Sequence, residues 1–448
     1  MKASDQRVLK GGRVYLEGKI QEKDLYLHNG LVYTDPPQGS DSWPVLDCRG
    51  LHIFPGFVDL HVHFREPGQE YKETIETGSM AAAHGGYTTV CTMPNLNPVP
   101  DSLDHLKIQL DRIREKARVH VLPYGSITQG EKGRALSDFD ALAPYVVAFT
   151  DDGVGVDSER TMEEAMIRAK ALGKAIVAHA EDRDLVEGGV IHDGDYAKVH
   201  GHKGNPSASE YVQVRRDLAL AEKTGVHYHV CHVSTKESVQ SIREAQEKGV
   251  KASFETAPHY LTLTDQDLQE DGRFKMNPPI RGEEDREALR RAMVEGALSA
   301  IATDHAPHSQ EEKAGGLDHS LNGIVGLETA FPVCYTDLVK GGVTSLENLV
   351  DLLSTRPTET LGLHKIRDPH FVLAPGLGIQ DGGPADLTLF DLEEAYRIDP
   401  RDFLSKGQAS PFTGKTVYGR CLATWVAGQR AYADMDRLEG REALHESV

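Results

Sequence analysis

His61 and His63 lie two positions apart in the apolar run VDLHVHF. Residues two apart on a β-strand project from the same face, so both imidazoles can reach one metal ion. The pair alone is weak evidence, because a solvent-facing pair or a pair satisfied in the core has the same spacing. A metal site therefore requires further ligands elsewhere in the chain.

Other groups of metal-ligand type end further short apolar runs. They are Asp151 with Asp152, His179, His232, and Asp304 with His305. Imidazole and carboxylate ligands with open positions are typical of catalytic Zn²⁺, and Mn²⁺, Fe²⁺ and Co²⁺ bind the same groups. The set exceeds what one tetrahedral zinc needs. Two ions about 3.5–4 Å apart, sharing a bridging carboxylate, are therefore an alternative to a single ion.

The middle of the chain alternates between short apolar runs and amphipathic stretches. Eight runs are expected as strands: VDLHVHF, YTTVCTMPN, VHVLPYGSIT, YVVAFTDDG, AIVAHAED, HYHVCHVS, KASFETAPHYL and LSAIATDHAPH. Several stretches between them open on Ser or Thr with Glu nearby and close on Gly, as helices do. This alternation favours a parallel (β/α)₈ barrel of the TIM type over residues 55–366, an α/β fold whose strand ends meet on one face. No GxGxxG motif opens a helix, which weakens a doubly wound alternative.

The two ends of the chain have a different texture. Short β-type runs punctuated by Gly and Pro occupy residues 1–54, and similar runs return within residues 367–448. We expect one small β-sandwich domain assembled from both termini, because two separate units would each be short of core.

Residues 184–206 are polar and Gly-rich, and are expected to form a loop inserted after the fifth strand. Three histidines lie there: His192, His200 and His202. An extra metal site is one interpretation of them, but a solvated loop is the favoured one.

The composition of the 448 residues excludes several classes of protein. With 39% hydrophobic and 26% charged residues, the chain can build a large core and is not disordered. A formal net charge of −20 argues against binding to nucleic acid. No apolar run approaches the roughly 20 residues of a membrane helix, and the N-terminus lacks the apolar stretch of a signal peptide. The five scattered cysteines are expected to be reduced, buried thiols of a cytoplasmic protein.

Eight blocks, in order along the chain, carry a family resemblance. They are GFVDLHVHFREPG (56–68), MPN (93–95), FTDDG (149–153), AH (178–179), CHVSTK (231–236), KMNPP (275–279), ATDHAPH (302–308) and GLETA (326–330). Together they resemble the dihydroorotases of the metal-dependent amidohydrolase superfamily. The fold that this resemblance implies, a barrel with a small β domain from both termini, agrees with the pattern of strands and helices.

The resemblance also implies the roles of individual residues. The implied metal ligands, for one or two Zn²⁺ ions per subunit, are His61, His63, Asp152, His179, His232 and Asp304. Asp304 is also the implied general acid/base. Many superfamily members bridge their metals with a carboxylated lysine on the fourth strand, but YVVAFTDDG contains none, so Asp152 resembles the bridging aspartate of a bacterial type. Its neighbour Asp151 is expected to point away by strand alternation.

Substrate contacts are implied at a further group of residues: His63, Arg65, Asn95, Asn277, His308, Asn322 and Gly323. Arginine geometry suits a bidentate grip on a carboxylate, which dihydroorotate carries. Asn277 is expected to read the amide edge of the pyrimidine ring. Family members usually have an aromatic or apolar residue at the position of Asn322, so this side chain is a departure whose effect depends on whether it or only the backbone contacts substrate.

The activity implied by the resemblance is the reversible cyclisation of N-carbamoyl-L-aspartate to (S)-dihydroorotate plus water in pyrimidine (UMP) biosynthesis. Two alternatives stay open: another cyclic amidohydrolase, such as allantoinase or dihydropyrimidinase, or a non-catalytic homologue that scaffolds aspartate transcarbamoylase. A lysine-free fourth strand and a carboxylate pocket argue against the first, and a complete ligand set against the second. The family also allows a homodimer and an association with aspartate transcarbamoylase.

Overall fold

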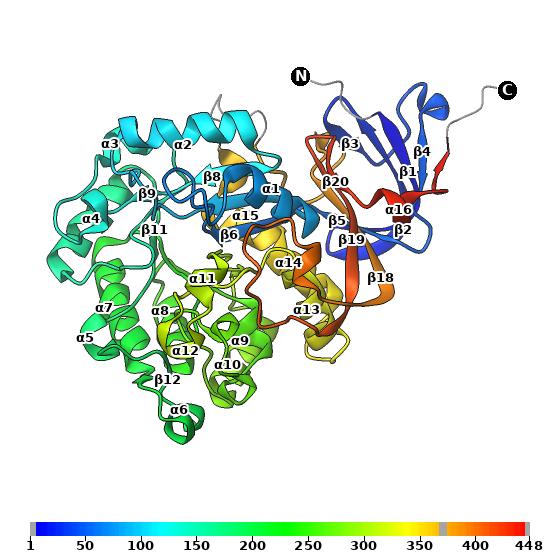
Figure 1. Ribbon diagram of the computed structural model, residues 1–448. Helices are drawn as coiled ribbons and strands as arrows, with labels where there is room; N and C mark the ends of the chain where they lie inside the picture. Colours follow the sequence, from blue (N-terminus) through cyan, green and yellow to red (C-terminus); the bar gives the residue numbers. More distant parts are fainter. Residues whose placement is uncertain (1–5, 367–373, 444–448) are drawn as a thin grey trace.

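The computed structural model describes residues 6–366 and 374–443. Figure 1 shows a barrel surrounded by helices, with a β-rich layer packed against one side of it. The strands of the barrel, the third being interrupted into β8 and β9, are β6 (Phe57–Val62), β7 (Tyr87–Thr92), β8 (His120–Pro123), β9 (Gly125–Ser126), β10 (Phe149–Thr150), β11 (Ile176–Ala178), β14 (Tyr228–Val230), β15 (Ala252–Thr256) and β16 (Ala300–Ile301). Each of the eight predicted runs therefore contains a strand, and the predicted α/β barrel is confirmed.

The barrel strands are parallel and join in chain order. One ladder links β6, β7 and β8, and another runs from β9 through β10, β11, β14 and β15 to β16. The circle closes beside the metal-ligand motif, where Val62 bridges to His305 and the His63 N–H donates to the His305 carbonyl over 2.8 Å. Strands from all round the barrel contribute to one buried cluster, which includes Cys91, Leu122 and Val177.

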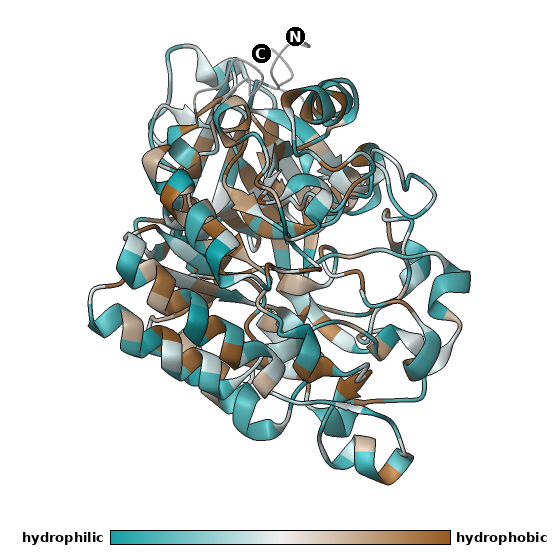
Figure 2. Cartoon of the chain, turned by 90° about the vertical axis from the view of Figure 1, so that its left-hand side faces the viewer, coloured by the Kyte–Doolittle hydropathy of each residue, from teal (hydrophilic) through white to brown (hydrophobic). Residues whose placement is uncertain are grey.

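Helices cover the outside of the barrel. They are α1 (Ile75–His84), α2 (Leu103–Lys116), α3 (Phe139–Leu142), α4 (Glu159–Ala171), α7 (Ala208–Thr224), α8 (Lys236–Glu247), α9 (Pro258–Thr262), α10 (Glu283–Val294), α13 (Ala330–Cys334), α14 (Leu346–Leu353) and α15 (Thr355–Leu361). The side chains of Thr74, Ser158 and Thr235 each accept an N–H from the first turn of a helix, and Thr235 opens one of the predicted stretches. Ser102, before α2, makes no such hydrogen bond. Figure 2 shows hydrophilic and hydrophobic residues alternating along these helices, as expected when one face packs on the strands. Among the described residues, no helix has the length and apolar character to cross a membrane.

The β-rich layer is one connected sheet built from both ends of the chain. Its strands are β1 (Arg7–Leu16), β2 (Lys19–His28), β3 (Leu31–Tyr33), β4 (Val45–Asp47), β5 (His52–Pro55), β17 (Gly383–Pro384), β18 (Leu387–Arg397), β19 (Thr416–Val426), β20 (Gln429–Ala433) and β21 (Glu442–Ala443). β1 pairs with β2 on one side and with both β4 and β5 on the other, so the sheet forks there. Around the fork lies a separate core that includes Leu9, Leu46 and Trp425.

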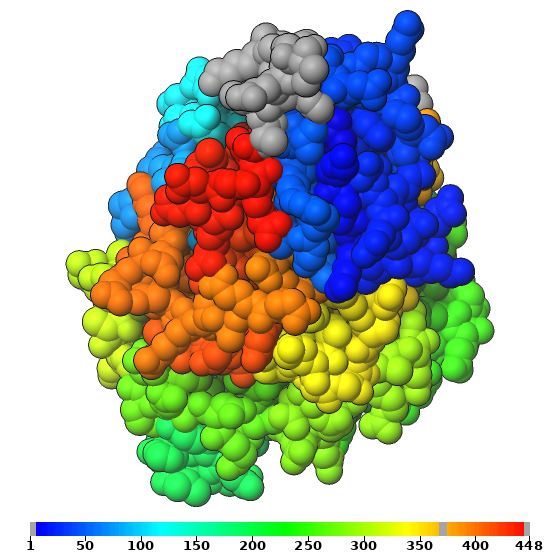
Figure 3. All heavy atoms as spheres, turned by 90° about the vertical axis from the view of Figure 1, so that its right-hand side faces the viewer, coloured from blue at the N-terminus to red at the C-terminus, as the bar shows by residue number. Residues whose placement is uncertain are grey.

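The two ends of the chain lie side by side on the face seen in Figure 3, where the N-terminal residues in blue border the C-terminal residues in orange and red. The antiparallel pairing of β5 with β18 joins them. Helix α16 (Met435–Leu438) adds Leu438 to the shared core. The predicted boundary between residues 366 and 367 adjoins residues 367–373, which lie outside the described part of the chain.

The insertion after the fifth strand has more structure than a plain loop. It contains α5 (Arg183–Val186), β12 (Ile191–His192), α6 (Asp195–His200) and β13 (Gly204–Asn205). Ile191 and Ala197 are buried in a small cluster with Leu268 and Met276, so the expectation that this segment contributes nothing to a core is wrong. The segment carries too few apolar residues to show a period, and their partners lie about eighty residues away in the sequence.

Candidate metal centre and substrate pocket

The carboxyl ends of the barrel strands bring the predicted ligands together. His61 is the penultimate residue of β6, and His63 comes directly after that strand. The other ligands follow their strands within three residues: Asp152 after β10, His179 after β11, His232 after β14 and Asp304 after β16. Parallel strands wound into a barrel present these ends on one face. Residues far apart in the sequence therefore share one small volume.

Asp152 lies at the middle of this cluster. Its Oδ1 is 3.3 Å from His61 Nε2, 3.7 Å from His232 Nε2 and 3.8 Å from His179 Nδ1. Its Oδ2 is 3.4 Å from His63 Nε2. One carboxylate thus has its two oxygens directed at different histidines, which is the disposition that a bridging ligand requires.

Asp304 faces the other side of the HxH pair. Its Oδ1 is 3.1 Å from His63 Nε2 and 3.5 Å from His61 Nε2. Two ligand triplets result, His61–His63–Asp304 and His61–Asp152–His232, each with its ligand atoms within 4.8 Å of one another. The set can be shared between two ions or can surround one.

Two buried polar atoms test whether a metal fits this cluster. His61 Nε2 and Asp152 Oδ1 lie 3.3 Å apart, but neither has a hydrogen bond of acceptable geometry within the described part of the chain, and both are shielded from solvent. A buried polar atom without a partner is costly, whereas a bound cation would use the lone pairs of both. The imidazole and carboxylate donors therefore fit a divalent metal ion.

The charges of the two carboxylates are consistent with this interpretation. Burial alone raises the pKa of Asp152, but the His61 ring more than compensates and holds that pKa well below its usual value. Burial likewise raises the pKa of Asp304, and the hydrogen bond with His63 and the nearby histidines lower it below the usual range. Both groups are therefore ionised, as metal ligands must be.

A carboxylate that the sequence analysis missed supports His61 from behind. Glu255, in β15, accepts a hydrogen bond from His61 Nδ1 at 2.9 Å and also contacts His229 Nε2 at 3.1 Å. His229 in turn contacts Ser253 Oγ at 2.8 Å. A proton on Nδ1 of His61 fixes the tautomer that leaves Nε2 free for a metal. The available sequence signal was a charged residue inside a predicted barrel strand.

Asp59 has a second supporting role. It is fully buried and accepts the backbone N–H of His61 at 3.0 Å and of Thr303 at 3.2 Å. It therefore ties the first strand to the residue before Asp304. The backbone itself is unusual here, because Arg65, His232 and Asp304 have positive φ angles of 56°, 33° and 50°. Such conformations are rare for residues other than glycine and cluster at functional sites.

A pocket of about 170 Å³ opens beside the cluster. Its lining includes every predicted substrate contact and every predicted ligand except His61, which lies behind: His63, Arg65, Asn95, Asp152, His179, His232, Asn277, Asp304, His308, Asn322 and Gly323. No lysine lines it among the described residues. The structure therefore brings the whole predicted site together in one cavity.

Arg65 is only 6% exposed, and its Nε donates a hydrogen bond to the Pro307 carbonyl at 3.3 Å. Burial lowers the pKa of its guanidinium to about 10, which leaves it charged at neutral pH. Asn95 Oδ1 accepts a hydrogen bond from His63 Nδ1 at 2.9 Å, so its amide nitrogen stays available to a ligand. Burial, with Arg65 and Lys72, lowers the pKa of His308 to about 3, so this ring is neutral.

Two further loops contribute Asn277 and Asn322 to the pocket lining. Asn277 donates through Nδ2 to Glu181 at 2.9 Å. Burial alone would raise the pKa of Glu181, but its contacts with His179 and Asn277 outweigh that effect and lower the pKa to about 2. Asn322 is exposed at the pocket mouth, and its carbonyl accepts a hydrogen bond from His308 Nε2 at 2.8 Å.

Several residues that the sequence left without a role are placed outside the site. Asp151 points away from the pocket and accepts the backbone N–H groups of Ile127 and Thr128, as strand alternation predicted. His202 lies between Asp318 Oδ1 at 2.8 Å and Glu270 Oε1 at 3.0 Å, and no metal-binding group found in the described residues includes it. The five cysteines are free and buried, as predicted.

A third ligand triplet, His61–Cys231–Glu255, is a weaker metal candidate. Burial raises the pKa of the Cys231 thiol, which disfavours the thiolate that a metal requires. Glu255 is already engaged by two histidines.

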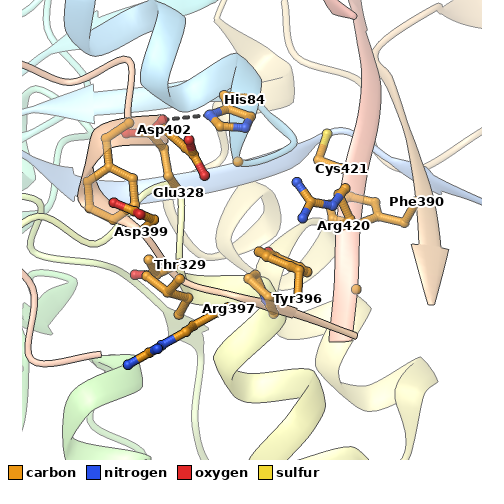
Figure 4. A pocket seen from close by; sticks show the side chains of 15 residues that line it. His84, Glu328, Thr329, Phe390, Tyr396, Arg397, Asp399, Asp402, Arg420 and Cys421 are labelled. Atoms are coloured by element: carbon orange, nitrogen blue, oxygen red, sulfur yellow. Dashed lines mark hydrogen bonds and ion pairs between the residues drawn. The ribbon is translucent and has the colours of Figure 1, made fainter. Parts of the chain in front are cut away.

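A second cavity lies between the barrel and the terminal sheet (Figure 4), away from the cluster. Its walls hold the pair His84–Glu328, with Nδ1 and Oε1 2.6 Å apart, and Arg420 stacked 3.9 Å above the Tyr396 ring. Its open space is about 40 Å³, and none of the predicted site residues lines it. The pocket at the strand ends, which the predicted site residues line, is therefore the candidate active site.

Comparison with known proteins agrees with this placement. Residues 50–238 match the family model described as Dihydro-orotase-like. Dihydroorotase of Bacillus cereus (strain AH820) is 47% identical over 430 residues, which are 95% of this chain and 98% of that protein. Dihydroorotase of Shouchella clausii (strain KSM-K16) is 49% identical over 417 residues, 93% of this chain and 95% of that protein. The chain belongs to the dihydroorotase family.

The similar solved structures share the fold at lower identity. L-Hydantoinase (dihydropyrimidinase) from Arthrobacter aurescens has a TM-score of 0.83 and 26% identity, covering 95% of this chain and 96% of that one. D-Hydantoinase from a Bacillus sp. AR9 has a TM-score of 0.80 and 24% identity, covering 96% and 95%. Membership of the dihydroorotase family and the buried His/Asp groups together indicate a metal cofactor.

Proposed function

We propose that this chain is a zinc-dependent dihydroorotase that interconverts N-carbamoyl-L-aspartate and (S)-dihydroorotate plus water in UMP biosynthesis. The observation that carries the proposal is one cavity that combines the His/Asp cluster with a buried, charged Arg65. A neutral cyclic amide has no carboxylate with which that arginine could form two charge-assisted hydrogen bonds. The relatives at 47–49% identity are named Dihydroorotase, whereas the hydantoinases share 23–26% identity.

The metal would be held by His61, His63, Asp152, His179, His232 and Asp304. Zinc, as one or two ions, suits this set of imidazoles and carboxylates. When bound, it supplies Lewis acidity, which polarises an amide carbonyl and eases the ionisation of water.

Asp304 carries the proton in this proposal. In the hydrolytic direction it accepts a proton from the attacking water, whose oxygen bonds to the ring carbonyl carbon. The bond from that carbon to the ring nitrogen breaks, and Asp304 returns the proton to this nitrogen. In the cyclising direction the same residue takes the proton from the carbamoyl nitrogen as that nitrogen bonds to the carbon of the substrate's protonated side-chain carboxyl group. It then gives the proton to the departing hydroxyl, which leaves as water. Its position at the junction of cluster and pocket allows both transfers.

Positioning comes from the surrounding side chains. Arg65 grips the substrate carboxylate, with Asn95 and His308 beside it, and Asn277 contacts the amide edge of the ring. The neutral His308 donates its Nε2–H in the free protein to the Asn322 carbonyl, so the ring is already oriented before substrate enters.

The test is turnover by the metal-loaded chain. Purified protein at defined zinc should hydrolyse dihydroorotate and turn over dihydrouracil and hydantoin poorly, with Asp304→Asn as the inactive control. Faster turnover of a neutral ring than of dihydroorotate would replace this proposal with the dihydropyrimidinase alternative. Absence of turnover from a fully metal-loaded chain would favour a scaffolding role.

We also propose a cytoplasmic location, because all five cysteines are free and buried. A homodimer and an association with aspartate transcarbamoylase stay predictions from the family resemblance.

A further inference from the structure

The loop that carries Asn322 and Gly323 is packed tightly against the pocket. Gly323 has a φ of 137°, and a Cβ at this position would lie 2.6 Å from the Ala306 carbonyl oxygen. Its N–H donates to the Lys275 carbonyl at 3.0 Å. Small displacements of this loop therefore move groups that line the cavity.

Lys313, the last residue of α11 (Gln310–Lys313), fastens this loop from behind. Its Nζ donates to the carbonyl oxygens of Leu321 at 2.7 Å, Gly323 at 2.7 Å and Lys275 at 2.9 Å. Two of these carbonyls flank Asn322, and the third belongs to the segment that leads to Asn277. One ammonium thus joins two loops that line the pocket.

Lys313 is a buried lysine whose ammonium group is fully hydrogen-bonded to the backbone. The residue is only 8% exposed, and no carboxylate forms an ion pair with it in the described residues. Burial and the neighbouring Lys275 lower its pKa to about 7. A buried cation is costly unless its hydrogen bonds are satisfied, and here all three donor positions are used on backbone carbonyls. An aliphatic side chain would fill the same space but would leave the Leu321 and Gly323 carbonyls without this donor.

We propose that Lys313 is a positioning residue for substrate binding, which holds the Asn322–Gly323 loop and the Asn277 segment in the geometry that the substrate requires. The inference rests on the proposed function, because it concerns the binding of dihydroorotate in this pocket. Lys313 itself does not touch the pocket contents: it acts through the backbone of Leu321, Gly323 and Lys275. The hydrogen bond from His308 to the Asn322 carbonyl extends the same restraint to the carboxylate side.

Lys313→Met tests the proposal, because methionine fills similar volume without donors. The matched control is Lys174→Met: Lys174 is half-buried, its Nζ donates to the Val146 carbonyl at 2.6 Å, and it does not line the pocket. In Lys313→Met, KM for dihydroorotate should rise about tenfold or more while kcat changes less than about threefold, and zinc content should stay at the parent level. In Lys174→Met, KM should stay within about threefold of the parent.

Amide hydrogen exchange of the peptide spanning residues 319–326 gives a readout that needs no substrate. It should accelerate in Lys313→Met and not in Lys174→Met, because only the first substitution frees the carbonyls beside Asn322. Should Lys313→Met fail to fold, Lys313→Gln keeps two donors and should give an intermediate KM and intermediate exchange.

Parent-like KM and exchange in Lys313→Met would overturn the proposal. An equal rise of KM in both variants would also overturn it, since the loss would then be one of general packing. If the parent protein fails to turn over dihydroorotate, the proposed function fails, while the exchange comparison still decides whether Lys313 orders the loop.

Discussion

Arg65→Lys is the substitution that most directly tests substrate recognition. Lysine keeps the positive charge but loses the planar fork that binds both oxygens of a carboxylate. The guanidinium is buried and anchored through Nε to the Pro307 carbonyl, so its terminal nitrogens are directed into the pocket. The positive φ of 56° at this residue costs arginine and lysine alike, so the exchange leaves the backbone cost unchanged.

The expected loss follows from the number of hydrogen bonds. A bond between charged groups in a buried site contributes about 1.5–3 kcal/mol, and lysine keeps one of the two that arginine forms with a carboxylate. Loss of the other corresponds to about 10- to 150-fold in kcat/KM for dihydroorotate. Dihydrouracil, the same ring without the carboxylate, should be turned over poorly by the parent and should lose little more in the variant.

The assay compares kcat/KM of parent and variant for both rings at the same zinc occupancy. The ratio between substrates isolates the one interaction that they do not share. Equal slowing of both substrates would refute the reasoning, because Arg65 would then support the structure of the site and not read the carboxylate. Selectivity for dihydroorotate would in that case rest on Asn95 and His308.

Three further substitutions or treatments probe the cluster. Asp304→Asn should lower kcat about 100- to 10,000-fold while at least one metal stays bound by metal analysis, because an amide cannot accept the proton and asparagine tolerates the positive φ; near-parent turnover would remove Asp304 from the acid/base role. Metal-free protein reconstituted with zinc should regain the same activity with and without bicarbonate, because Asp152 lines the cavity and, among the described residues, no lysine that could be carboxylated does. A bicarbonate requirement would show that a carboxylated lysine reaches the metal. Glu255→Gln should weaken zinc binding about 10- to 100-fold in chelator competition, since the charge that orients His61 is lost; unchanged affinity would leave Glu255 with a purely structural role.

Much of the candidate site could be predicted from local patterns. The HxH spacing, the acidic or histidine residues at the ends of five of the eight apolar runs and the alternation of strands with helices are short-range features. The order of motifs identified the family. The structure places every one of those residues in or beside one cavity. The sequence could do this because a barrel converts position at a strand end into proximity, whatever lies between the strands.

Supporting residues escaped sequence reasoning for a physical reason. Glu255 looks like a charged residue in a strand, and Lys313 looks like one more surface lysine in an acidic helix. Their roles depend on partners 194 residues away in one case, at His61, and on three backbone carbonyls in the other. Backbone carbonyls have no sequence signature, and burial of a charge becomes visible only when its surroundings are assembled.

The insertion after the fifth strand shows the same limit. Its polarity correctly indicated that it lies outside the barrel, but not that Ile191 and Ala197 pack on Leu268 and Met276. The sequence by itself determined the fold class, the ligand types and the chemistry, because periodicity, residue type and motif order are local. Only the tertiary structure decided which carboxylate supports which histidine, which tautomer results and what holds the substrate loop, because those depend on contacts between segments that the chain brings together on folding.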